Sequence, residues 1–374
     1  MSATGTDRYP ASGVPDVTTA RRPPLAPGDR RIGGHSLAFL RDPLGSLERW
    51  GGTDEPVVRL RIAGQTICLV TDPEAVQRVL ATDAGDYRKA EVVRERLGTL
   101  QGGSLVLFEG EAWRERRQLL QSGFTAEQVA EMGSLTTEYA AEMVASWPTD
   151  RPVALDDRAS DISLAILARA LFGLDIRGER TPIHEAAEDV LARMDMQSAS
   201  TYLPEWVPTP TNRRFRRAVA TLHDRLDETV AERAESDDPD GDLLGTMLAA
   251  GLPAETVRDE LVAFLFAGFD STALACTLGL LAEHPDVQAR LHRELDAQLD
   301  GREPTPAELQ ELPTLDAIVR ESLRPYPPQY LLFREPTTAV TLGGYRVDPG
   351  RIVVLSPWVL HRDERFWTAP REFR

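Results

Sequence analysis

The feature that most constrains this chain is an apolar run with polar residues at its centre. Residues 263–279 read AFLFAGFDSTALACTLG, and the apolar pattern around them predicts one long helix over 254–284. Asp270, Ser271 and Thr272 interrupt the run, and such groups cost free energy when they are buried without partners. The run therefore needs either a functional or a packing explanation.

Gly268 also needs an explanation, because a glycine inside a helix costs about 1 kcal/mol relative to alanine. Glycine beside hydroxyl residues favours a kink, which would leave a groove for water and a path for protons next to Asp270. The alternative is a close helix crossing at Ala267 and Gly268, with Asp270 at a surface edge. The run alone does not decide between them.

Length and composition indicate an ordinary globular protein. The chain has 374 residues, 42% hydrophobic and 27% charged, enough for one large domain or two modest ones. The formal charge of −17 argues against non-specific nucleic-acid binding, which needs a positive surface. Residues 1–25 are polar and rich in Pro, lack the apolar core of a secretory signal, and are predicted to be a flexible lead-in.

Two cysteines, Cys68 and Cys276, lie far apart in the chain. This spacing fits neither a disulfide framework nor a zinc site, so each is interpreted as a small buried hydrophobic residue. No uninterrupted apolar stretch is long enough to span a membrane, and the predicted location is the cytoplasm.

Helical patterns dominate the chain, and the predicted class is mainly α with small β portions near each end. A hairpin with a Gly-Gln turn is expected over 56–70, and short strands over 337–357. Asp72 is an expected N-cap with Pro73 next, and Thr125 with Gln128 forms a capping-box pattern. The predicted helices are 36–50, 73–82, 110–122, 125–147, 160–173, 181–195, 212–235, 254–284, 285–299 and 306–324.

Two further pairs could carry chemistry. Trp113 and Arg117 are four residues apart on a basic helix, so one face offers an indole N–H and a guanidinium to an anion. Glu321 and Arg324 share a helical face. Taken singly, a solvated basic helix and an exposed ion pair worth roughly 0–1 kcal/mol are the ordinary interpretations.

The order of these motifs resembles that of one family. FEGEAWRERRQLLQSGF, AGFDST, ESLRPYPPQYLLFREP and HRDERFWTAPREFR are similar, in this order, to segments of the cytochromes P-450, the haem-thiolate monooxygenases of soluble prokaryotic type. The resemblance runs from about residue 23 and implies a single cytochrome P-450-like domain over 26–374, incomplete at its C-terminus. It implies haem b as cofactor and insertion of one oxygen atom of dioxygen into a hydrophobic small molecule.

The resemblance also assigns roles by position. Trp113, Arg117 and Arg334 would bind haem propionates, and Lys89, the only lysine in the chain, a further basic contact. Ala267 and Gly268 would lie over the haem. Asp270 and Ser271, with Thr272 beside them, would deliver protons to dioxygen. Glu321 and Arg324 would be structural. Electrons would come from an external ferredoxin- or flavodoxin-type donor and its NAD(P)H reductase.

One departure from the family pattern concerns the iron ligand. The family holds its iron with a cysteine thiolate in a loop that would follow Arg374, so no metal ligand is expected in this chain. Three interpretations stay open: a fragment of such a monooxygenase that is inactive by itself, a haem-free auxiliary or scaffold protein, and a decayed product.

Overall fold

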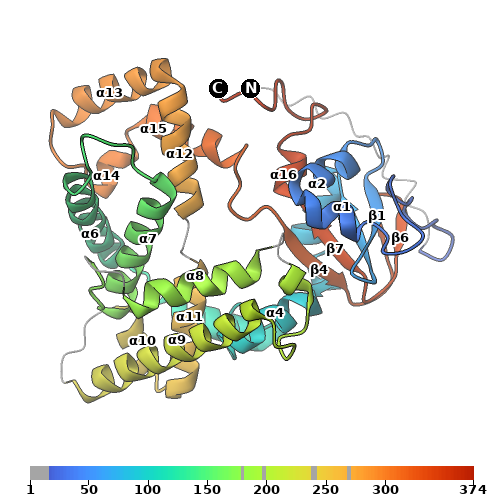
Figure 1. The fold of residues 1–374 in the computed structure, drawn as a ribbon, viewed down its shortest axis with the longest axis horizontal. Coiled ribbons are helices and arrows are strands. Elements are labelled where there is room, and N and C mark those ends of the chain that lie inside the picture. The colour runs from blue at the N-terminus through green and yellow to red at the C-terminus, as the bar shows by residue number, and fades with distance from the viewer. Residues whose placement is uncertain (1–16, 178–180, 196–198, 237–241, 268–270) are drawn as a thin grey trace. The chain divides into compact units, whose positions relative to one another are not determined.

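The computed structural model describes residues 17–177, 181–195, 199–236, 242–267 and 271–374. Helices make up most of these residues, and the strands form one five-stranded and one two-stranded sheet (Figure 1). The predicted class, mainly α with small β portions, is confirmed.

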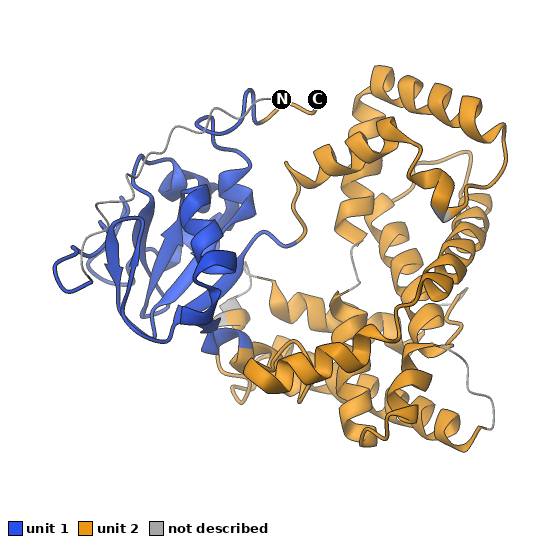
Figure 2. Ribbon diagram, turned by 180° about the vertical axis from the view of Figure 1, so that it is seen from behind, with its two compact units in different colours: residues 1–93, 329–370 blue, residues 94–328, 371–374 orange. Residues whose placement is uncertain are grey.

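The chain forms two compact units (Figure 2). The first combines residues 1–93 with 329–370, and the second combines residues 94–328 with 371–374. Each is described by itself.

The first unit is built on a mixed sheet. It contains, in order across the sheet, β1 (Val57–Ile62), β2 (Gln65–Val70), β7 (Ile352–Leu355), β4 (Leu332–Pro336) and β3 (Tyr87–Lys89). β2 and β7 are parallel, whereas the other neighbours are antiparallel. The β portions expected separately near the two ends of the chain therefore share one sheet.

Small elements surround this sheet. β5 (Val340–Leu342) and β6 (Tyr345–Val347) form a separate hairpin, and the helices are α1 (Ser36–Arg41), α2 (Pro43–Gly51), α3 (Pro73–Gln77) and α16 (Pro357–Leu360). The predicted helix 36–50 is wrong in one respect, because it is broken. Pro43 has no N–H to continue α1, and the Asp42 side chain instead accepts from the Gly45 N–H at 2.9 Å and begins α2.

The turn between β1 and β2 differs from the expected Gly-Gln pair. Ala63 and Gly64 occupy it, with φ of 50° and 79°. A two-residue hairpin turn that matches the right-handed strand twist needs positive φ at both positions. Gly64 adopts this without strain, whereas Ala63 is one of the few residues other than glycine to do so.

The second unit is helical. Its elements are α4 (Glu91–Gln101, whose first turn lies in the first unit), α5 (Gly110–Gln121), α6 (Ala126–Ala145), α7 (Leu155–Phe172), α8 (Pro182–Met194), α9 (Pro210–Glu235), α10 (Leu243–Ala249), α11 (Ala254–Ala267), α12 (Ser271–Glu283), α13 (Pro285–Leu299), α14 (Pro306–Leu309) and α15 (Pro313–Leu323).

The helix ends follow the expected capping chemistry with one correction. The capping box at Thr125 and Gln128 is confirmed, and so is the Asp72 N-cap with Pro73 in the first turn. The predicted single helix over 306–324 is wrong, since α14 ends at Leu309. Pro313 then occupies the first turn of α15, where its missing N–H costs nothing.

α11 contributes to the hydrophobic core of the second unit. It packs against α7 and α9, and Val257, Leu261, Val262 and Leu265 are buried in the core there. By length and hydropathy the stretch Ala254–Glu283 would also qualify as a membrane-crossing helix. A single such stretch is weak evidence for a span, because buried core helices share these properties.

We expect Ala63→Asn to raise the free energy of unfolding by about 0.5–1 kcal/mol, because asparagine tolerates the left-handed conformation that alanine adopts here under strain. Urea unfolding followed by circular dichroism measures the change. Ala63→Val is the opposing control and should destabilise, since a β-branched residue is poorest at positive φ. Equal stabilities of the two variants would contradict this turn geometry.

Candidate functional site

α5 carries the pair of residues, Trp113 and Arg117, that is predicted to bind an anion. Trp113 and Arg117 lie one turn apart, and the guanidinium carbon of Arg117 is 5.1 Å from the centroid of the indole ring. Arg117 is exposed, and none of the carboxylates that the structure describes pairs with it. A guanidinium held on an aromatic face, with an indole N–H beside it, suits a carboxylate ligand such as a propionate.

A second cationic pair lies in the sheet of the first unit. Lys89 on β3 is directly opposite Arg334 on β4, and both side chains are half-buried. Arg334 Nη1 donates to the Phe333 carbonyl at 2.9 Å. In the next pair of the ladder, Glu335 accepts from Arg88 at 3.1 Å.

The proposed proton path lies partly outside the described residues. Gly268 and Asp270 are not among them. Ala267 is exposed at the C-terminal end of α11, and Ser271 begins α12 with 8% of its surface exposed. Thr272 is exposed, so of the two hydroxyl residues it is Ser271 that faces the protein interior.

Glu321 and Arg324 form a bidentate ion pair at the end of α15. The Arg324 Nε and Nη2 atoms donate to the two Glu321 oxygens at 2.9 and 2.8 Å, and the Arg324 side chain is 7% exposed. Arg324 also donates to the Glu372 carbonyl at 2.7 Å, and the Arg374 N–H donates to Glu321 at 3.1 Å. The pair therefore ties α15 to the segment around residue 372.

The two thiols are poorly suited to iron. Cys68 lies on β2 among apolar core residues, and burial raises the pKa of its thiol to about 12. Cys276 is half-buried on α12, where burial also raises its pKa. The described residues contain no group of three or more His, Cys, Asp or Glu side chains that could hold a metal ion. The residues present thus fit the carboxylate groups of a haem better than its iron.

Sequence reasoning missed an acidic pair on α11. Asp259 and Glu260 are 7% and 0% exposed. Asp259 accepts from the Gly103 N–H at 2.8 Å, and Glu260 accepts from the Leu105 N–H and from Arg116. Two adjacent acids within an apolar helical pattern were the available signal, because buried carboxylates require partners.

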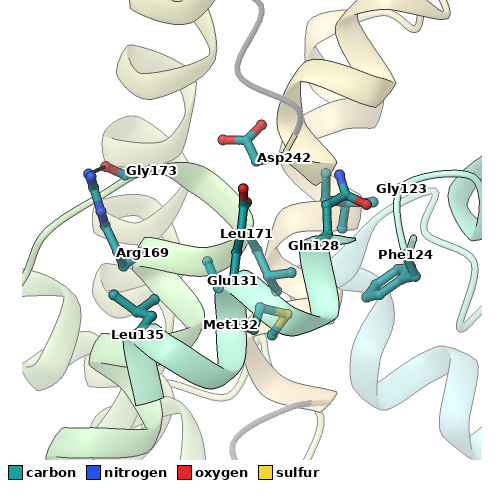
Figure 3. Close-up of a pocket in the computed structure, with 12 residues that line it drawn as sticks. Gly123, Phe124, Gln128, Glu131, Met132, Leu135, Arg169, Leu171, Gly173 and Asp242 are labelled. Carbon is teal, nitrogen blue, oxygen red and sulfur yellow. Dashed lines mark hydrogen bonds between the residues drawn. The ribbon is translucent and has the colours of Figure 1, made fainter. Parts of the chain in front are cut away.

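A surface cavity of about 400 Å³ lies elsewhere in the second unit (Figure 3). Gln128 and Glu131 of α6 line one side of it, and Arg169 of α7 lines another. None of the predicted site residues lines this cavity. Arg169 donates to the Gly173 carbonyl at 2.7 Å, which accounts for its position.

Comparison with known sequences gives a consistent result. The family model described as cytochrome P-450 matches residues 34–374. A cyclooctat-9-en-7-ol 5-monooxygenase of Streptomyces melanosporofaciens is 32% identical over 361 residues, which cover 93% of this chain and 78% of that protein. A pentalenene oxygenase of Streptomyces avermitilis is 28% identical over 357 residues, 93% of this chain and 79% of that protein.

Solved structures agree on the fold. The haem domain of cytochrome P450DA superposes with a TM-score of 0.82 at 26% identity, covering 95% of this chain and 81% of that domain. The cyanobacterial protein CYP120A1, solved with retinoic acid, superposes with a TM-score of 0.81 at 22% identity, with the same coverage, and supports the fold alone.

The predicted resemblance is thereby confirmed. With a family match from residue 34 to residue 374 and monooxygenases among its relatives, this chain belongs to the cytochrome P-450 family and is, at the general level, an oxidoreductase of the monooxygenase type.

Proposed function

We propose that this chain provides the haem-carboxylate-binding and proton-delivery residues of a monooxygenase that acts on a hydrophobic small molecule. The observation that carries the proposal is the pairing of Trp113 with Arg117 on α5. The relatives named for cyclooctat-9-en-7-ol and pentalenene favour a terpenoid substrate. Haem b, when bound, supplies reductive activation of dioxygen.

The protein's own residues have defined tasks in this proposal. Trp113 and Arg117 hold a propionate, whereas the roles that the resemblance assigns to Lys89 and Arg334 stay predictions. The hydroxyl of Ser271 holds a proton at the buried start of α12, while the role of Asp270 stays a prediction. The apolar face of α11 keeps water away from the reacting region.

The electron donor and the location in the cell are also proposals. Electrons would come from a separate ferredoxin- or flavodoxin-type protein with its NAD(P)H reductase, and the protein would work in the cytoplasm. The formal charge of −17 supports a small-molecule function over nucleic-acid binding.

Porphyrin binding tests the proposal without requiring an iron ligand. Metal-free protoporphyrin IX and its dimethyl ester differ only in their carboxylates, and tryptophan fluorescence quenching measures both dissociation constants. We expect the free acid to bind at least about tenfold tighter, since a hydrogen bond to a charged group contributes about 1.5–3 kcal/mol. Arg117→Gln should remove most of this difference.

Arg114→Gln is the matched control on the same helix. Arg114 is exposed and pairs with Glu111 at 2.8 Å, so its removal should leave the ratio of the two dissociation constants unchanged. Equal binding of acid and ester by the unaltered protein would reject the propionate assignment and favour a haem-free auxiliary or decayed protein.

The state of the two thiols predicts the outcome of haem addition. With ferric haem added, then reduced under carbon monoxide, this 374-residue chain should give no thiolate-type Soret band, because neither Cys68 nor Cys276 is suited to the iron. A thiolate-type band that disappears in Cys68→Ser or Cys276→Ser would show that one of these cysteines is a ligand after all.

The Glu321–Arg324 pair is proposed as structural. Glu321→Gln should lower the free energy of unfolding by about 3 kcal/mol, because it replaces a charged partner of the buried Arg324 guanidinium with a neutral amide. Urea unfolding measures the change. Arg320→Gln breaks an exposed pair with Asp316 and should cost less than about 1 kcal/mol. Similar losses for both variants would argue against a structural role.

A further inference from the structure

The carboxylate of Glu260 joins three elements of the second unit. Its side chain is fully buried on α11, and both of its oxygens accept from the Leu105 N–H, at 2.9 and 3.0 Å. Arg116 of α5 donates to the same carboxylate at 3.0 Å from a side chain that is only 15% exposed. One acid therefore fixes both the turn that precedes α5 and α5 itself.

A negative charge suits residue 260 better than a neutral amide of the same size. Burial is the largest influence on Glu260 and raises its pKa, while the Leu105 N–H and Arg116 act in the opposite direction. Glu260 Oε1 accepts from both the Leu105 N–H and Arg116, and Oε2 accepts from the Leu105 N–H. A glutamine with its amide oxygen in the Oε1 position would place an amide N–H close to the Leu105 N–H, and it would remove the negative charge that faces Arg116.

Asp259 also holds the turn at residues 102–105, and it leaves no room for a side chain there. Its Oδ2 atom accepts from the Gly103 N–H at 2.8 Å, and a Cβ on Gly102 would lie only 1.9 Å from that oxygen. Gly102 also has a φ of +45°. Asp259 has its own cation, because Arg258 donates to it at 2.9 Å, so Arg116 is left to Glu260.

The contact between Glu260 and Arg116 determines which face of α5 is turned toward α11. Arg116 and Arg117 are adjacent, so their side chains leave the helix about 100° apart. With Arg116 bound to α11, Arg117 and Trp113 are directed to a different side. Phe124, just beyond α5, adds a second attachment, since its ring lies 5.7 Å from that of Phe264 on α11.

Glu260 also shares a helical face with the C-terminal end of α11. Glu260 and Ala267 are seven residues apart, about two turns, and therefore lie on nearly the same face of α11. One carboxylate thus links the helix that carries the proposed propionate donors to the helix that leads to the proposed proton donor.

We propose that Glu260 is a positioning residue, which holds Arg116 and the turn at 102–105 so that Trp113 and Arg117 are oriented for a porphyrin carboxylate. The inference rests on the proposed function and deepens it.

The test uses the preference of the full chain for protoporphyrin IX over its dimethyl ester, called here the propionate selectivity. We expect Glu260→Gln to lower this selectivity about tenfold, approaching the loss in Arg117→Gln, although residue 260 is not expected to touch the porphyrin. Hydrogen exchange at the Leu105 amide should become faster. Glu255→Gln is the control, an exposed acid on the same helix, and should change neither measurement.

A double variant keeps the test decisive if Glu260→Gln destabilises the fold. Glu260→Gln combined with Arg116→Gln removes both charges together and leaves no buried unpaired ion. If the double variant folds and keeps wild-type selectivity, the pair is merely structural and the inference is overturned. Loss of selectivity in the folded double variant supports it.

Different results would overturn the haem-carboxylate assignment and the role of Glu260. Absence of propionate selectivity in the unaltered protein would overturn the haem-carboxylate assignment and this inference with it. Selectivity that is present in the unaltered protein and lost in Arg117→Gln, but retained in Glu260→Gln, would overturn the role of Glu260 alone.

Discussion

The burial of α11 is the constraint on which the second unit depends. Each fully buried valine or leucine on this helix contributes roughly 1.5–3 kcal/mol, and the helix packs against α7 and α9. A helix so placed cannot carry an uncompensated charge. Asp259 and Glu260 are tolerated there because backbone N–H groups and arginines surround them, and this requirement fixes the turn before α5 against α11.

Two adjacent arginines on α5 have different environments in the folded protein. Arg116 is drawn inward to a buried carboxylate, whereas Arg117 stays exposed against the Trp113 ring. In the sequence WRERR the spacing from Trp113 distinguishes Arg117, but no local pattern predicts a buried partner for Arg116. The inward contact of Arg116 follows from the position of Glu260, which lies more than a hundred residues further along the chain.

Local chemistry was predictable where it acts over a few residues. The capping box at Thr125 and the Asp72 N-cap are short-range hydrogen-bond patterns, and both are present. The breaks near Pro43 and Pro313 were missed because hydrophobic periodicity continues across them. The spacing of Glu321 and Arg324 was visible, but their burial and the contact with Glu372 were not, since these depend on residues distant in sequence.

By itself the sequence determined the helical class, the family and the order of the motifs, because these rest on residue types at short, regular spacing. Only the tertiary structure decided that strands from both ends of the chain share one sheet, and that Ser271 rather than Thr272 faces inward. These outcomes depend on burial and long-range pairing, which no local pattern encodes.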